Sequence, residues 1–347
     1  MSIESNLERL SNINGVTGRE EAARELIIKL IKPYVDESYE DKLGNVITIK
    51  KGKKSKPKIM LAAHMDEIGL MVKNISKEGF LQFAKMGGID DRILLAQKVV
   101  VQTSEGDLVG IIGSKPPHIQ KKEERNKVVT YDKLFIDIGA ENVKTAKQMG
   151  VKIGDPISFT VKYEKIGKTI VTGKAFDDRA GCAVMIETLK KLESTDCNIF
   201  AVGTVQEEVG LRGAGTAAFG IDPDFGIALD VTVAGDVPGV SDFESNIKMG
   251  KGPAITVSDA GLISHPKVLS LLVDTANKHN IPYQLETGLP GTTDAARISL
   301  TRQGVPSGTV SIPTRYIHSP VGILNLTDVK NSIKLVTSTI DEIQKKF

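Results

Sequence analysis

Lys58-Ile-Met-Leu-Ala-Ala-His-Met-Asp66 is the stretch of sequence that decides the fold. Its apolar run is nearly continuous, which predicts a strand buried on both faces, as in a parallel sheet covered by helices. His64 and Asp66 follow two residues apart, so in an extended chain their side chains point to the same side. A metal-binding imidazole is often oriented by such a carboxylate. On its own, however, the pair is more commonly an ordinary hydrogen-bonded histidine at a strand end.

Strands and helices alternate around this stretch. The spacing of Thr17 and Glu20 is that of a capping box and predicts a helix start. Apolar runs and 3.6-residue periodicity predict further elements. The predicted strands are 46–49, 198–205, 226–231 and 307–312, and the predicted helices are 178–193, 266–279, 294–302 and 327 to the C-terminus. This alternation implies the α/β class, with a mostly parallel sheet flanked by helices.

The pattern changes between about residues 68 and 165. Short strand-like runs at 98–102, 108–112, 134–138 and 156–161 are partly separated by turn signals, which predicts a small β-barrel-like domain. Its polar middle, 116–127, is expected to be a mobile loop. We therefore expect residues 1–67 and 166–347 to form one discontinuous domain and 68–165 an inserted β domain.

Composition narrows the classes of partner. The 347 residues include 45 basic and 43 acidic ones, for a net charge of +2, which gives no argument for a nucleic acid or an anionic membrane as partner. No apolar run is long enough for a signal-peptide core or a membrane span. Cys182 and Cys197 are too few for a disulfide framework. The expected location is the cytoplasm.

Further acidic residues and a second histidine lie next to predicted elements. Asp177 stands where a helix is expected to begin, Glu207 and Glu208 follow a strand, Asp230 ends a strand, and His318 follows the strand 307–312. Taken singly, each has an ordinary structural explanation: in the same order, a helix cap, an acidic turn, a turn aspartate and a loop histidine. A glutamate pair also allows one carboxylate to bind metal while the other moves protons.

Together these residues indicate a metal site. Ligands of open α/β sheets bind beyond the carboxyl ends of the strands. Two histidines and at least three carboxylates, without a thiolate, match a two-metal site with imidazole and carboxylate ligands.

Six motifs carry a resemblance to a known family. In chain order they are LAAHMDEIGLMV, KAFDDRAGC, VGTVQEEVGLRGAGTAAF, ALDVT, GTTDAARI and RYIHSPVG. They span nearly the whole chain and closely resemble the cobalt- or zinc-dependent aminopeptidases that include the glutamyl and the tetrahedral, deblocking aminopeptidases. The resemblance implies a zinc-peptidase-like catalytic domain and an insert that builds oligomer contacts. It also implies a homo-oligomer in which dimers assemble to a dodecamer.

The resemblance also implies a role for each matching residue. The implied ligands of two divalent ions per subunit, Zn²⁺ or Co²⁺, are His64, Asp177, Glu208, Asp230 and His318, with Asp177 bridging the ions. Glu207 matches the general base and Asp66 the carboxylate that supports His64. The bond between Asp177 and Asp178 is expected to be cis. The implied reaction is the release of the N-terminal residue from short peptides, an EC 3.4.11 type of activity.

The substrate pocket is less defined by the sequence. The loop 288–294 carries a family motif, so Gly291, Thr292 and Asp294 are expected to line the site. Arg297 and Arg315 could attract an acidic first side chain or be structural. The sequence therefore leaves open an acidic or an aliphatic preference, the physiological metal, the exact oligomeric state and the use of N-blocked peptides.

Four alternatives compete with this function; one of them, a structural α/β protein, would match the six motifs only by chance. An endoglucanase-type glycoside hydrolase needs two carboxylates and no metal, which leaves the two histidines unexplained. Another dinuclear amide hydrolase on a related fold, such as a deacylase or carboxypeptidase, differs from an aminopeptidase in a simple test, whether N-acetylation of a peptide abolishes its cleavage. A binding protein without activity would usually have lost a ligand or the base.

Overall fold

The computed structural model describes residues 2–346, which form two compact units. The first takes in the chain up to Asp66, Lys162–Ile317 and the chain from Val321 onward, and the second takes in Glu67–Val161 and His318–Pro320. The first unit holds an 11-stranded sheet and the second a closed barrel.

The large sheet is parallel in its centre and antiparallel at its margins. Its main path is β1 (Glu37–Glu40), β2 (Val46–Lys50), β12 (Asn198–Thr204), β3 (Lys58–His64), β13 (Phe225–Val233), β16 (Ser307–Arg315), β17 (Gly322–Asn325), β11 (Ile170–Gly173) and β10 (Glu164–Lys165). Strands β12, β3, β13 and β16 pair in parallel. Off this path, β14 (Ala254–Asp259) pairs with β15 (Gln284–Leu289) and with β16. The predicted α/β class is confirmed, with the parallel pairing concentrated in the middle of a mixed sheet.

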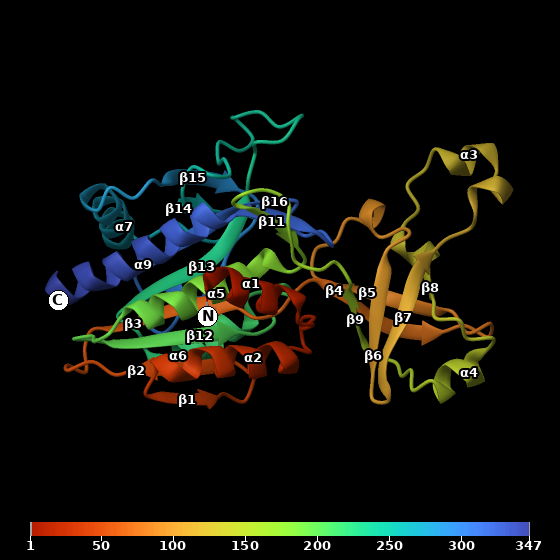
Figure 1. Ribbon diagram of the computed structural model, residues 1–347, viewed down its shortest axis with the longest axis horizontal. Helices are drawn as coiled ribbons and strands as arrows, with labels where there is room; N and C mark the ends of the chain where they lie inside the picture. Colours follow the sequence, from red (N-terminus) through yellow and green to blue (C-terminus); the bar gives the residue numbers. More distant parts are fainter. Residues whose placement is uncertain (1, 347) are drawn as a thin grey trace. The chain divides into compact units, whose positions relative to one another are not determined.

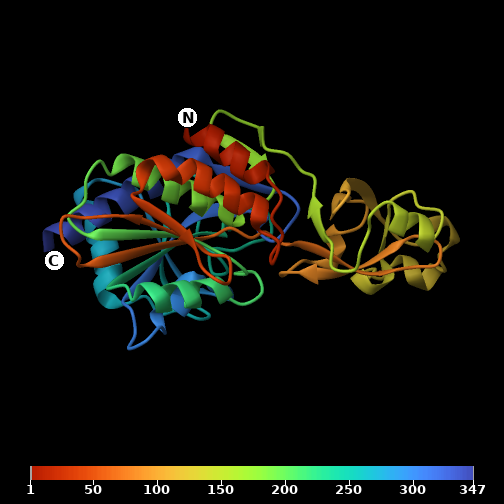
Figure 2. The same ribbon diagram turned by 90° about the horizontal axis from the view of Figure 1, so that it is seen from below.

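Helices cover both faces of this sheet (Figures 1 and 2). One face carries α1 (Ile3–Asn12), α2 (Glu21–Ile31), α5 (Phe176–Lys191), α7 (Pro266–Lys278) and α9 (Leu326–Lys346), and the other carries α6 (Arg212–Ile221) and α8 (Asp294–Ser299). Strand β3 supplies both cores by alternation: Ile59 and Leu61 belong to the same buried core as residues of α5 and α9, whereas Met60 and Ala62 belong to the core that includes α6. The prediction of a strand buried on both faces is thus confirmed.

The predicted capping box is wrong. Helix α2 begins at Glu21, and Glu20 is its N-cap residue without a side-chain cap. The Glu20 carboxylate instead accepts the N–H groups of Gly18, at 2.6 Å, and Gln206, at 3.2 Å. The Glu20 side chain therefore makes a tertiary contact instead of capping the helix, as the local sequence pattern had predicted.

The second unit is a closed barrel, as predicted. Its strand order is β4 (Gly69–Ile75), β5 (Leu81–Met86), β8 (Phe135–Asp137), β7 (Gly106–Gly113), β6 (Lys98–Thr103) and β9 (Pro156–Phe159). Leu70, Val72, Leu81 and Ile136 belong to its own buried core. Beside the barrel strands lie α3 (Lys122–Arg125) and α4 (Val143–Gln148), so the segment expected as a loop contains a short helix.

Short 3₁₀ turns complete the chain at Lys32–Tyr34, Asp91–Ile93, Pro117–Ile119 and Tyr131–Lys133. Within residues 2–346, none of the helices combines the length and the apolar character that crossing a bilayer would require.

Candidate metal centre

Parallel pairing brings the predicted site residues of the first unit to one edge of the sheet. His64 is the last residue of β3 and lies opposite Thr204, the last residue of β12. Asp230 lies on β13, which pairs with β3 on its other side. Because the strands run in the same direction, residues that follow β3 and β12 emerge beside Asp230.

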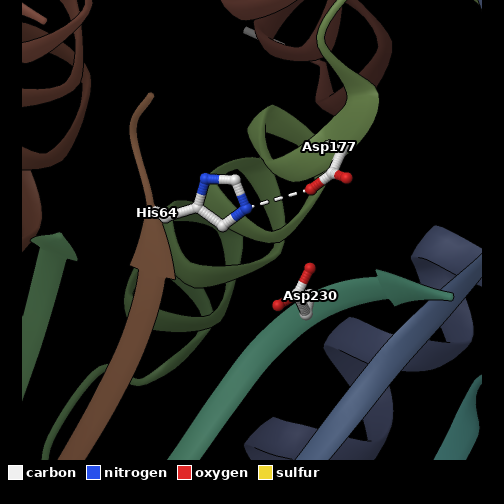
Figure 3. Close-up of side chains that lie close together, drawn as sticks. All are labelled: His64, Asp177 and Asp230. Atoms are coloured by element: carbon white, nitrogen blue, oxygen red, sulfur yellow. Dashed lines mark hydrogen bonds and ion pairs between the residues drawn. The ribbon is translucent and has the colours of Figure 1, made fainter. Parts of the chain in front are cut away.

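His64, Asp177 and Asp230 form a compact set of donors. One ligand atom from each lies within 4.8 Å of the others, and the Nε2 atom of His64 is 2.9 Å from Oδ1 of Asp177 (Figure 3). His64 and Asp230 are buried and Asp177 is half-buried. An imidazole nitrogen and two carboxylates converging in this way are suited to a divalent transition-metal ion.

The two adjacent aspartates at the start of α5 face different partners. The bond between Asp177 and Asp178 is cis, as the family resemblance implies. Asp177 faces His64, whereas the Asp178 carboxylate accepts the N–H groups of His64, at 3.1 Å, and Gly181, at 2.9 Å. A Cβ on Gly181 would come within 2.4 Å of Asp178, so only glycine leaves room for this contact. Asp178 thereby ties β3 to α5 and leaves Asp177 to the site.

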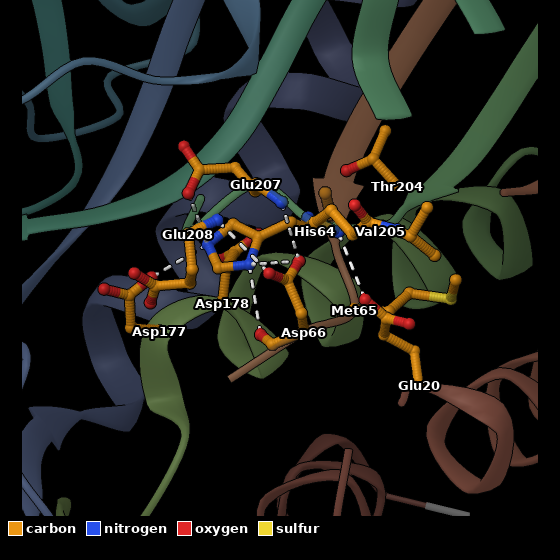
Figure 4. A network of polar contacts seen from close by, with 12 residues as sticks. Glu20, His64, Met65, Asp66, Asp177, Asp178, Thr204, Val205, Glu207 and Glu208 are labelled. Atoms are coloured by element: carbon orange, nitrogen blue, oxygen red, sulfur yellow. Dashed lines mark hydrogen bonds and ion pairs between the residues drawn. The ribbon is translucent and has the colours of Figure 1, made fainter. Parts of the chain in front are cut away.

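Asp66 holds the glutamate pair in place. It is fully buried and accepts the N–H groups of Glu207, at 3.0 Å, and Glu208, at 3.1 Å (Figure 4). One of its carboxylate oxygens is 3.5 Å from Nδ1 of His64, and its backbone carbonyl accepts from the same nitrogen at 3.1 Å. Burial alone would raise the pKa of Asp66, but hydrogen bonds from His64 and Glu207 hold it below its usual range.

The glutamates stand among like charges. Oε2 of Glu207 is 3.9 Å from Nε2 of His64, and a carboxylate oxygen of Glu208 lies within 4.8 Å of one of Asp177. Burial, followed by repulsion from Asp230 and Asp177 respectively, raises the pKa of Glu207 and of Glu208 well above the usual range. Burial and Asp177 do the same to the pKa of Asp230.

The crowding of these carboxylates indicates whether a metal ion suits the site. For each of these three carboxylates, His64 is the positive neighbour that opposes the shift. Burial alone would lower the pKa of His64, but the surrounding carboxylates raise it well above its usual value. A bound divalent cation would compensate the same negative charge and reverse these shifts. The donor set therefore fits metal binding.

His318 is described within the second unit. It is exposed, with φ of +57°, and its Nδ1 atom lies 2.8 Å from the carbonyl oxygen of Gly88. Since a carbonyl only accepts, Nδ1 carries the proton, and the lone pair of the neutral ring lies on Nε2. Such a contact fixes the tautomer that metal-binding histidines use.

The expected substrate residues differ widely in exposure. Gly291 is exposed, Thr292 is half-buried, and Asp294 is buried at the start of α8. Oδ2 of Asp294 accepts the hydroxyl of Thr204 at 2.5 Å, and burial raises the pKa of Asp294 to about 6. Asp294 thus contacts the last residue of β12.

Arg315 is paired in two places with Asp236. Its Nε and Nη2 atoms donate to Oδ1 and Oδ2 of that residue at 2.9 and 2.8 Å. Sequence reasoning did not identify Asp236 or Thr204. Asp236 stands alone in a loop, and Thr204 looks like an ordinary strand residue, so neither carried a recognisable pattern.

A parallel sheet whose carboxyl edge carries histidine and carboxylate donors defines a class, the metal-dependent hydrolases. The sequence model of the M42 glutamyl aminopeptidase family matches residues 44–335. The chain belongs to this family, and it is a metal-dependent aminopeptidase.

Three similar proteins support this assignment. The lysyl aminopeptidase of Pyrococcus furiosus is 37% identical over 97% of this chain and 96% of its own. The TET aminopeptidase of Thaumarchaeota archaeon SCGC AB-539-E09 is 41% identical, covers 98% of each chain and superposes with a TM-score of 0.95. The Pyrococcus horikoshii TET1 peptidase, which can assemble into a tetrahedron or a large octahedral shell, is 34% identical over 97% of this chain and 98% of its own, with a TM-score of 0.89.

Proposed function

We propose that this chain releases the N-terminal residue of short peptides with two divalent ions, Zn²⁺ or Co²⁺. The proposed ligands are His64, Asp177, Glu208, Asp230 and His318. The observation that carries the proposal is the convergence of His64, Asp177 and Asp230 within 4.8 Å, beside half-buried glutamates whose charge a cation would offset. When bound, such ions lower the pKa of water and polarise a carbonyl group.

Glu207 is the proposed general base. Its carboxylate lies beside the donor set, 3.9 Å from Nε2 of His64, and its backbone N–H is fixed by Asp66. In this position it would take a proton from the attacking water and return it to the leaving amine. Asp66 is a positioning residue, because it orders the two glutamates and lies against the His64 ring.

We extend the proposal to assembly and location. The first unit would be the catalytic domain, and the barrel would supply contacts between copies, as a dimer that assembles further to a dodecamer. The assembly of the Pyrococcus horikoshii relative supports this. Both cysteines are free and buried, which suits a reducing cytoplasm.

The test is hydrolysis of Leu-p-nitroanilide by EDTA-treated protein with and without Zn²⁺ or Co²⁺. Metal should restore activity, and Glu207→Gln should lower kcat by roughly 10²–10⁴-fold while binding the same amount of metal. Glu244→Gln, on an exposed loop glutamate, is the matched control. Activity that ignores metal, or a fully active Glu207→Gln variant, would refute the proposal.

Two further substrates separate the alternatives. Cleavage of N-acetyl-Leu-p-nitroanilide as fast as the free-amino substrate would indicate a deacylase or another amide hydrolase. Hydrolysis of carboxymethyl cellulose that survives EDTA would indicate a glycosidase.

A further inference from the structure

The chain makes an unusual turn between β12 and the two glutamates. Gln206, which directly precedes Glu207, has φ of +55°, in the left-handed region that residues other than glycine seldom adopt. Each of the four consecutive N–H groups of residues 205–208 donates to a side-chain oxygen. The position of Glu207 therefore depends on these acceptors and not on a regular helix or strand.

The acceptors come from three segments that are distant in sequence. Asn45 precedes β2, Asp66 follows β3, and Glu20 precedes α2. The acceptor and donor pairs are Asn45 with Val205, Glu20 with Gln206, and Asp66 with both Glu207 and Glu208. Glu20 is thus the acceptor for the N–H group of the left-handed residue itself.

Glu20 makes this contact from a buried position. It is 3% exposed and belongs to the same polar network as Asp66 and Glu207 (Figure 4). A single oxygen, Oε1, accepts the N–H group of Gln206 at 3.2 Å and that of Gly18 at 2.6 Å. Because one oxygen accepts both groups, the contact requires an acceptor at this place rather than a negative charge.

The N-terminal segment that carries Glu20 is fixed against the candidate metal centre. Arg179 is fully buried and donates from Nε to the carbonyl of Met65 at 2.7 Å and from Nη1 to the carbonyl of Leu10 at 2.9 Å. Met65 lies between His64 and Asp66. The segment precedes residue 44, where the match to the family model begins.

From these contacts we infer that Glu20 is a positioning residue for the proposed general base. Its Oε1 atom holds Gln206 in the left-handed conformation and so fixes Glu207 beside His64. Glu20 acts through the backbone of Gln206. The inference rests on the proposed function, in which Glu207 moves the proton.

Hydrogen exchange of the EDTA-treated protein tests the contact without any assay of catalysis. In Glu20→Ala the N–H group of Gln206 loses its acceptor, so a peptide spanning residues 204–210 should exchange at least about tenfold faster than in wild type. Glu20→Gln keeps an acceptor oxygen and should exchange at the wild-type rate. Unchanged exchange in Glu20→Ala would overturn the inference.

Kinetics of the Zn²⁺-loaded protein with Leu-p-nitroanilide test the consequence for Glu207. Glu20→Ala should lower kcat on the order of 100-fold, because a misplaced catalytic group loses its alignment, while KM changes by less than about threefold and the zinc content is unchanged. Glu20→Gln should stay within about threefold of wild type. If Glu20→Gln lost as much activity as Glu20→Ala, the argument from the acceptor oxygen would be wrong.

Asp328→Ala is the matched control, because Asp328 is also buried and also accepts two backbone N–H groups, those of Gly250 and Gly252. It should lose stability and keep its kcat. A fully active Glu20→Ala beside an inactive Glu207→Gln would overturn the inference and leave the proposed function intact. A fully active Glu207→Gln would instead refute the proposed function.

A second substitution at Gln206 separates positioning from a general loss of structure. Glycine adopts positive φ without strain, so adding Gln206→Gly to Glu20→Ala should recover about tenfold in kcat. Gln206→Ala removes the same side chain and its contact with Arg212 but keeps the Cβ atom, so it should recover nothing. Equal kcat in the two double variants would contradict the inference. If Glu20→Ala does not fold, Glu20→Asp replaces it in each comparison, because its shorter side chain withdraws the oxygen from Gln206.

Discussion

Asp66 and the other carboxylates of the candidate metal centre differ in how the protein treats their charge. Asp66 is surrounded by donors, and its pKa is held below the usual range. Glu207, Glu208 and Asp230 are crowded by one another, and the pKa of each is raised well above it. The fold satisfies the first carboxylate by itself, whereas the second set is arranged for a cation that the fold does not supply.

The comparison separates structural from functional acids. A carboxylate that accepts two backbone N–H groups stabilises the fold whether or not metal is present. A crowded carboxylate destabilises the metal-free protein and becomes favourable only when metal binds. Mutations in the two sets should therefore differ in sign as well as in size.

The largest effect is expected for Asp66→Asn. An amide cannot accept both N–H groups as well as a carboxylate does, and each such bond to a charged group is worth roughly 1.5–3 kcal/mol. We expect the variant to lose about 3 kcal/mol of unfolding free energy with or without metal, measured by urea denaturation, and about 100-fold in kcat/KM.

Asp328→Asn is the matched control for this experiment. Asp328 is also fully buried and accepts the N–H groups of Gly250 and Gly252, at 2.5 and 2.8 Å, but it lies at the start of α9 and belongs to neither group of candidate metal-binding residues. It should lose stability and keep its activity. If Asp66→Asn behaved in the same way, the positioning role of Asp66 would be wrong.

Thr204→Val should have a smaller effect. It removes the hydroxyl that donates to Asp294, at 2.5 Å, and leaves a second oxygen of this buried carboxylate without a donor. We expect a loss of about 1–2 kcal/mol of unfolding free energy. Thr204→Ser keeps the hydroxyl and should recover most of it. Equal loss in both variants would mean that the methyl group, not the hydrogen bond, matters.

The sequence predicted the parts of this site that lie on regular strands. The apolar run before His64 fixed β3 as a central strand, and parallel pairing then placed Thr204 and Asp230 next to it. The N–H contacts of Asp66 could not be predicted, because they depend on how the chain turns after β12. Nor could the Asp236–Arg315 pair, whose members are 79 residues apart. Glu20 was misassigned for the same reason, since its partner Gln206 is distant in sequence.

Asp230→Asn should have the opposite sign to Asp66→Asn in the metal-free protein. Neutralising one crowded carboxylate relieves repulsion from Asp177, so the EDTA-treated variant should be about 1 kcal/mol more stable than wild type. With saturating Zn²⁺ the order should reverse, because the variant would lack one of the proposed ligands. A thermal melt with and without Zn²⁺ measures both, and a variant that is less stable under both conditions would count against the crowding argument.

The smallest expected effect is the change of stability with pH, which measures the repulsion among the crowded carboxylates most directly. For an acid whose folded pKa is raised, stability is fully present below the unfolded pKa, about 4, and is lost as the pH rises through the folded pKa. For Asp294, with a pKa of about 6, this window lies between about pH 4 and 6, and for Glu207, Glu208 and Asp230 it extends upward from about 4.

The Tm of EDTA-treated wild type should therefore fall by about 2–4 °C more between pH 5 and 8 than that of EDTA-treated Asp230→Asn. Saturating metal should remove this difference in slope, because bound cations replace the protons that the crowded carboxylates otherwise take up. Equal slopes for the two EDTA-treated proteins would mean that the carboxylates are not crowded in solution, and the charge argument for a metal at this edge of the sheet would then fail.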